Sequence, residues 1–210
     1  MTESAPTNPA PAQTDWIARW QHVARRIRVP LGFLTAALYL FECRRAPHPA
    51  AIAWSLVLVV PGLLLRAYAS GCVKKNSELT VTGPYAHTRN PLYLGSMLIA
   101  AGFALALMSW QVALALALGF VVIYVPVIAS EERFLRAAFP EFDEYRRHVP
   151  RLLPRLIPAR NSEDKSTRGA FSLSLYLQHR EYNAGIGAVV LYLSLLLLRP
   201  LLAPYVNLPR

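Results

Sequence analysis

The sequence predicts an all-α membrane protein of about five transmembrane helices, two of which form a helical hairpin. Hydrophobic residues make up 54% of the 210-residue chain, while charged residues make up only 16%. Soluble domains usually carry roughly 25% charged residues. The charges are also separated by long uncharged runs, as in membrane-spanning chains. This composition excludes a disordered chain, because disorder requires low hydrophobicity and much charge.

The hairpin is predicted from the longest stretch without Asp, Glu, Lys or Arg, which runs from Asn90 to Ser130. Two spans of about 20 residues fit into this length. A polar break at Ser109–Gln111 lies near the middle and predicts the turn. The expected arms are therefore Leu92–Met108 and Val112–Ala129.

Three further apolar runs complete the expected spans. Ala46–Leu65 is uncharged along its whole length and is long enough for one crossing. Val29–Phe41 is the shortest of these runs and predicts a short or tilted first span. Ala184–Leu198 is slightly longer and predicts the last span.

The distribution of Lys and Arg predicts the orientation. If the N-terminus is cytoplasmic, most of the 22 basic residues lie in cytoplasmic segments. Basic residues are enriched in cytoplasmic loops, so we expect an integral protein of an inner, cytoplasmic-type membrane with its N-terminus inside. Topology thus explains the net charge of +10. Because no nucleic-acid-binding motif accompanies this charge, we expect no nucleic-acid partner.

The expected organisation has five parts. The core holds the hairpin and the motifs described below, and a cytoplasmic linker and helix follow it. The boundaries are 1–28 for a partly disordered N-terminal segment, 29–73 for the first two spans, 74–158 for the core, 159–183 for the linker and helix, and 184–210 for the last span and tail. Two cysteines are too few for a disulfide scaffold or a cysteine-rich zinc site, and we expect no metal.

The segment before the hairpin predicts an anion site. Asn90-Pro91 is a typical helix start, because Asn is a good N-cap and Pro is favoured at the first helical position. The free N–H groups and the positive dipole end of the helix then lie near Arg89. An arginine beside a membrane helix also serves as a topology anchor, so this motif alone leaves both readings open.

Two acidic residues follow the second arm of the hairpin. Arms of equal length bring Glu131 and Glu132 to the same membrane face as Arg89. Packed helices lie about 8–10 Å apart, so these charges are expected within reach of one small ligand. A salt bridge between them is the simpler alternative. The residues from Glu131 to His148 also show helical spacing of apolar side chains and predict an amphipathic interfacial helix.

The segment His148–Pro158 has a proline at every fourth position. This spacing forbids a regular helix and predicts an extended, apolar and basic segment at the membrane surface. We expect it to cover the end of the hairpin, with an interfacial anchor as the alternative.

Two of these motifs together resemble a known family. GPYAHTRNPLYLG and EERFLRAAFPEFDEYRRHVPRLLP are similar in order and separation to the motifs of the isoprenylcysteine carboxyl methyltransferase family. The resemblance covers Leu79–Pro158, with Asn90 where the family often has His and Pro140 where Gly is common. It implies an integral membrane enzyme that uses S-adenosylmethionine (SAM) at a cytoplasmic cofactor site.

The resemblance also implies site residues. The catalytic candidates are Arg89, Tyr93 and Glu132, and the substrate-binding candidates are Arg151 and Arg155. The cofactor-binding candidates are Tyr85, His87, Arg89, Asn90, Pro91, Tyr93, Gly95, Glu131 and Glu132.

The chemistry of SAM fits several of these residues. Arg89 and the helix start suit the carboxylate, and Glu131 or Glu132 suits the ammonium. Tyr85 and Tyr93 suit the adenine or the sulfonium. The sequence has no glycine-rich dinucleotide loop, so the cofactor has to bind a helical membrane fold.

The acceptor stays open at this stage. A lipophilic acceptor is expected to enter sideways from the bilayer. A prenylcysteine-like carboxylate needs no general base, whereas a phospholipid amine needs one, for which His87, Glu131 and Glu132 are candidates. An NADPH-dependent membrane reductase and a non-catalytic scaffold are further alternatives. Oligomeric state and the contribution of His179–Tyr182 are also left open.

Overall fold

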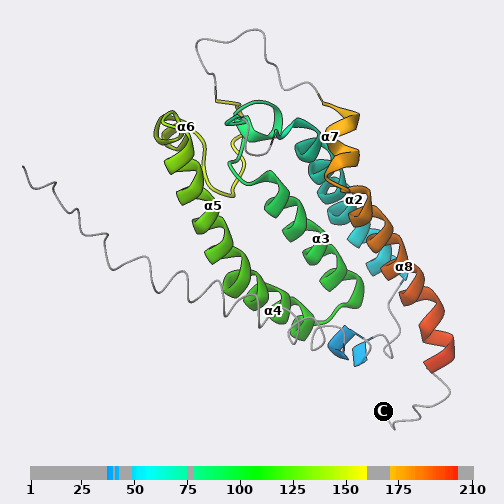
Figure 1. Cartoon of the computed structure of the whole chain (residues 1–210). Helices are drawn as coiled ribbons and strands as arrows, with labels where there is room; N and C mark the ends of the chain where they lie inside the picture. Colours follow the sequence, from blue (N-terminus) through cyan, green and yellow to red (C-terminus); the bar gives the residue numbers. More distant parts are fainter. Residues whose placement is uncertain (1–36, 40, 43–48, 75–77, 160–170, 203–210) are drawn as a thin grey trace, which may run out of the picture.

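The computed structural model describes residues 37–39, 41–42, 49–74, 78–159 and 171–202. In these ranges the chain forms helices and connecting turns, with no strand (Figure 1). The all-α prediction is confirmed for this part of the chain. The predicted segment 1–28 and most of the predicted first span lie outside the described residues, and the count of five spans stays a prediction.

In the part of the chain that the structure describes, two helices are long and apolar enough to cross a membrane. The first is α2 (Pro49–Cys72), with 24 residues and a mean hydropathy of 2.0. The second is a continuous helix of 29 residues with a mean hydropathy of 2.7. It is made up of α4 (Trp110–Gly119), the π-helix η2 (Phe120–Tyr124) and α5 (Val125–Ala138).

The other apolar helices are shorter. These are α3 (Pro91–Leu107) and α8 (Tyr182–Leu202). The predicted first arm of the hairpin, Leu92–Met108, agrees with α3 to within one residue at each end. Met108 has a left-handed φ of 48° and ends this helix. Ser109 then caps α4 by accepting a hydrogen bond from the Val112 N–H at 3.3 Å.

Small residues bring α2 and α3 close together. A Cβ added to Gly102 would lie 2.4 Å from Val59 Cγ2 and 2.9 Å from the Ser55 carbonyl oxygen. A Cβ added to Gly95 would lie 2.8 Å from the Gly62 carbonyl oxygen. Membrane helices pack closely at such positions because glycine lets two backbones approach. The α2–α3 pair is thus the rigid part from which the site is built.

The prediction of one amphipathic helix from Glu131 to His148 is wrong. The second arm of the hairpin continues through Glu131 to Ala138, and a separate short helix, α6 (Phe142–His148), follows. The break lies at Pro140, whose ring cannot continue a regular helix. Figure 1 shows α5 rising to α6 beside the start of α3.

Several short elements gather at the end of the molecule where α3 begins. They are η1 (Gly83–Ala86), α6 and the segment 149–159, which has no helix, as its prolines predict. Phe142, Tyr145 and Val149 form a small core here. On α2, the short helix α7 (Leu173–Gln178) is attached by a hydrogen bond from the Ser172 N–H to the Gly71 carbonyl at 2.9 Å.

Candidate functional site

Glu132 is the centre of a charged cluster at the start of α3. Its carboxylate lies 3.2 Å from Nη1 of Arg89. It also accepts hydrogen bonds from Arg151, whose Nε lies 3.1 and 3.2 Å from the two carboxylate oxygens. The hydrogen bond that Arg151 donates to the Glu132 carboxylate raises the pKa of Arg151. The structure therefore joins three of the predicted site residues, which come from α5, the loop before α3 and the segment after α6.

Arg89 is the least solvated cation of this cluster. Its side chain is 14% exposed, like that of Glu132. Burial lowers the pKa of Arg89, an effect that the Glu132 carboxylate opposes. The buried Nε of Arg89 has no hydrogen-bond partner among the residues that the structure describes. An unused buried donor on a cation is costly unless an acceptor binds there.

The loop before α3 is held by the segment after α6. The Arg89 N–H donates to the Pro150 carbonyl at 2.9 Å. The Asn90 side chain donates to the Arg151 carbonyl at 3.0 Å. Asn90 stands at the N-cap of α3, as predicted, but its side chain makes no capping bond. The free amide groups at the start of α3 are thus not satisfied by Asn90.

Glu131 has surroundings different from those of Glu132. It accepts a hydrogen bond from the Tyr93 hydroxyl at 2.8 Å, and no cation lies within ion-pair distance of it in the described ranges. The Tyr93 ring meets the Tyr124 ring edge-on, with centroids 5.3 Å apart. The two neighbouring acids, which the sequence could not distinguish, therefore face different partners.

A large apolar groove begins at Glu131. It has a volume of about 1410 Å³ and lies between α3, the continuous helix α4–η2–α5, and α8. Arg66 and Glu131 are its charged lining residues, and small residues of α8, including Gly187, line it further along. The π-helix Phe120–Tyr124 contributes to its wall. Single π-helical turns inside α-helices occur frequently at functional sites.

Arg66 is a groove residue that sequence reasoning assigned only to topology. Its Nη2 lies 2.7 Å from Glu181, just before α8, and its Nη1 donates to the Leu92 carbonyl at 3.2 Å and to Ser96. It therefore joins α2, α3 and the start of α8. Arg66 and Glu181 are 115 positions apart in the sequence. The sequence signals for their contact were an arginine at the end of one predicted span and a glutamate before another.

The remaining predicted residues lie around this cluster. Tyr85 is buried, and its carbonyl accepts from the Tyr145 hydroxyl at 2.7 Å. The ring Nδ1 of His87 lies 2.7 Å from the Arg155 carbonyl, so His87 contacts the segment after α6. Gly95 lies at the crossing of α2 and α3. The assignment of these residues to the cofactor stays a prediction.

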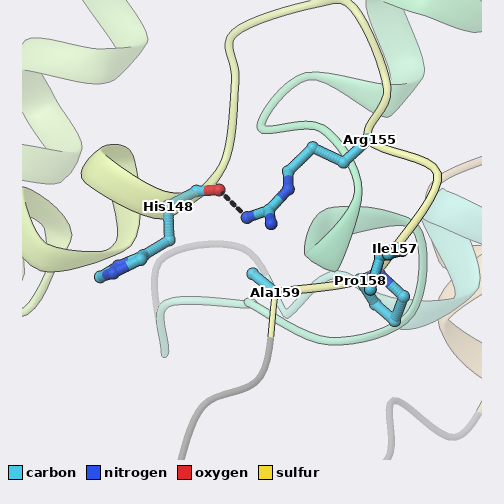
Figure 2. A pocket seen from close by; sticks show the side chains of 5 residues that line it. All are labelled: His148, Arg155, Ile157, Pro158 and Ala159. Carbon is cyan, nitrogen blue, oxygen red and sulfur yellow. Dashed lines mark hydrogen bonds between the residues drawn. The ribbon is translucent and has the colours of Figure 1, made fainter.

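Arg155 is separate from the groove. It lines a smaller hollow of about 460 Å³ with His148, Ile157, Pro158 and Ala159 (Figure 2). Figure 2 shows its guanidinium donating to the main-chain oxygen of His148. Arg151 contacts Glu132, and neither Arg151 nor Arg155 is among the residues that line the groove.

The cluster fits the polar end of SAM. The unused donor of Arg89 suits a carboxylate, and the Glu131 carboxylate, which has no ion-pair partner among the described residues, suits an ammonium. No group of three or more His, Cys, Asp or Glu that could hold a metal ion occurs in the part of the chain that the structure describes.

Glu131 lines one end of the apolar groove, and its sequence neighbour Glu132 belongs to the charged cluster, whose residues Arg89, Glu132 and Arg151 do not line the groove. Residues 62–141 match the family model of phospholipid methyltransferases. That family belongs to the isoprenylcysteine carboxyl methyltransferase-type group of integral membrane methyltransferases, and the match confirms the resemblance in the motifs.

Two curated relatives are similar over 89 residues. The cobalt-zinc-cadmium resistance protein CzcN of Cupriavidus metallidurans is 45% identical, over 42% of this chain and 40% of its own length. The nickel-cobalt-cadmium resistance protein NccN of Alcaligenes xylosoxydans xylosoxydans is 43% identical, over 42% of this chain and 41% of its own. The chain thus spans about two fifths of the length of these relatives. No solved structure matches it.

Proposed function

We propose that this chain is an integral membrane methyltransferase that uses SAM and acts on a lipophilic acceptor from the cytoplasmic face. The observation that carries the proposal is Arg89, a cation 14% exposed with a buried donor that has no partner in the described ranges. The match of residues 62–141 to a methyltransferase family supports the same conclusion.

Different side chains hold different parts of SAM. Arg89 binds its carboxylate, and Glu132 keeps the guanidinium in place from the opposite side. Glu131 lies where an ammonium and the groove are both within reach, beside the Tyr93 ring. When bound, SAM supplies an electrophilic methyl group on a sulfonium. The chain contributes chiefly positioning and exclusion of water.

The groove holds the acceptor. A carboxylate acceptor of the prenylcysteine type is ionised already and needs no proton removed. Tyr93 and Ser96, which line the polar end, then orient it. The apolar walls bind its tail in the bilayer.

A phosphatidylethanolamine-type amine is the second candidate acceptor. The observation that favours it is Glu131, which accepts from the Tyr93 hydroxyl and has no ion-pair partner in the described residues. A carboxylate in this position is able to take the proton that an ammonium group must lose before methylation.

Transfer of a labelled methyl group in lipid nanodiscs tests the proposal. We expect the labelled methyl group of SAM to appear in N-acetyl-S-farnesylcysteine or in phosphatidylethanolamine. Transfer should be lost in Arg89→Gln and retained in the matched control Arg147→Gln, at an exposed residue of α6. Glu131→Gln is expected to weaken transfer to either acceptor, because Glu131 also holds the cofactor, and to abolish transfer to the amine, which needs the base in addition. Transfer to neither acceptor, with stabilisation by NADPH but not SAM, would indicate a reductase. Stabilisation by neither would indicate a scaffold.

A further inference from the structure

The segment Val149–Ala159, here called the strap, has an apolar outer face. The side chains of Leu153, Leu156 and Ile157 are 80%, 98% and 75% exposed. Three large apolar residues at such exposure within five positions are unusual on a surface that faces water. The strap also contains two arginines and no acidic residue.

The strap cannot turn this face inward, because its backbone is fixed from the other side. Val149 is 1% exposed and packs with Phe142 and Tyr145. Further along, the Arg155 N–H donates to the His87 carbonyl at 2.9 Å, and the Ala159 N–H donates to the Ala86 carbonyl at 3.0 Å. The outward position of the apolar side chains is therefore set by the fold.

Arg155 provides a cation beside this apolar face. Its guanidinium donates to the His148 carbonyl, and no carboxylate lies within ion-pair distance of it among the described residues. The hollow that it lines is otherwise formed largely by Ile157, Pro158 and Ala159 (Figure 2). Arg151, the other arginine of the strap, is engaged with Glu132. Arg155 is thus the strap cation that is available to an external anion.

We propose that the strap docks onto the anionic lipid leaflet at this end of the molecule. Arg155 binds the phosphate of an anionic phospholipid in the hollow, and Leu156 and Ile157 enter the boundary between headgroups and acyl chains. Apolar side chains combined with a cation are the features that bind such a surface. In the orientation predicted from the basic residues, this is the cytoplasmic leaflet. Arg155 then recognises bulk lipid instead of the methyl acceptor.

The docked strap also connects the lipid surface to the charged cluster. The Pro150 carbonyl accepts a hydrogen bond from the Arg89 N–H, and the Arg151 carbonyl accepts one from the Asn90 side chain. Anionic lipid that fixes the strap therefore also fixes the loop that carries Arg89. This consequence rests on the proposed function, because it concerns the affinity for the cofactor.

Site-directed spin labelling tests the docking without reference to the cofactor. Labels are placed at Leu156→Cys and at the matched control Arg147→Cys, exposed on α6, with Cys43 and Cys72 replaced by Ala. In nanodiscs we expect the label at position 156 to be accessible to oxygen and shielded from a nickel chelate, with the reverse at position 147. Equal accessibility of both labels to the chelate would overturn the proposal.

Lipid composition tests the role of Arg155. Phosphatidylglycerol added to phosphatidylcholine nanodiscs is expected to immobilise the label at position 156, and Arg155→Gln is expected to abolish this response, while Arg147→Gln retains it. An identical response in the presence and absence of Arg155 would refute the anionic lipid site.

Titration with S-adenosylhomocysteine, the product form of the cofactor, tests the connection to the cluster. We expect an affinity about five-fold higher with phosphatidylglycerol, a difference that Arg155→Gln removes. Equal affinity in both lipids would overturn the connection. Absence of binding in every lipid would refute the proposed function, while the spin-label result would still decide the docking.

Discussion

Replacement of Glu132 by Gln tests whether one carboxylate holds the charged cluster together. The substitution keeps the size of the side chain but removes the charge that faces Arg89 and Arg151. Breaking a fully buried ion pair costs about 3–5 kcal/mol. Here Arg151 is 45% exposed and can be rehydrated, and Gln still accepts a hydrogen bond. We therefore expect the free energy of unfolding to fall by about 2 kcal/mol.

Thermal unfolding in detergent measures this effect. For a chain of this length, about 2 kcal/mol corresponds to a Tm about 4–8 °C lower. The matched control is Glu144→Gln on α6, whose carboxylate is 64% exposed and pairs with Arg147 at 3.6 Å. We expect about 0.5 kcal/mol or less for this exposed pair. Equal Tm changes in the two variants would refute the reasoning that Glu132 is the organising charge.

Other predictions concern a buried tyrosine and three glycines. Tyr145→Phe is expected to cost about 1 kcal/mol, because the buried hydroxyl donates to the Tyr85 carbonyl at 2.7 Å. Burial raises the pKa of Tyr145, so only the unfolded state loses the hydroxyl proton above a pH of about 10, and the free energy of unfolding should fall there. Urea unfolding should show a smaller alkaline decrease of this free energy in Tyr145→Phe. Gly102→Ala should destabilise by about 1–3 kcal/mol in thermal unfolding, because its Cβ meets Val59 and Ser55, whereas Gly185→Ala, with open space around it, should not. Gly187→Leu should reduce methyl transfer about ten-fold by displacing about two acceptor methylenes from the groove, while Gly185→Leu, outside the groove lining, should leave transfer unchanged.

The sequence predicted the parts of the fold that depend on local signals. The uncharged run 90–130 and the break at Ser109 placed α3 and the start of α4 close to their observed bounds. The Asn90-Pro91 start and the extended form of the strap also follow from local rules about proline. The end of α5 could not be predicted in this way, because apolar spacing continues across the break at Pro140.

Pairing between distant residues was predictable only in part. Equal arms of the hairpin placed Arg89 and Glu131-Glu132 at one face, and the structure confirms an ion pair from Arg89. Which acid forms it depends on the rotation of α5, and a shift of one residue turns a side chain by about 100°. The contact of Arg66 with Glu181 depends on the docking of α8, and the positions of these residues at span ends do not indicate that they pair with each other.

Calorimetric titration with S-adenosylhomocysteine in lipid nanodiscs measures whether Arg89 holds the cofactor. We predict saturable binding to the unmodified chain and an affinity at least ten-fold lower in Arg89→Gln, because a charge-assisted hydrogen bond is worth about 1.5–3 kcal/mol. The control Arg146→Gln, which removes a half-exposed partner of Asp143 on α6, should bind like the unmodified chain. Undiminished affinity in Arg89→Gln, or no binding to the unmodified chain, would contradict the assignment of Arg89 to the cofactor.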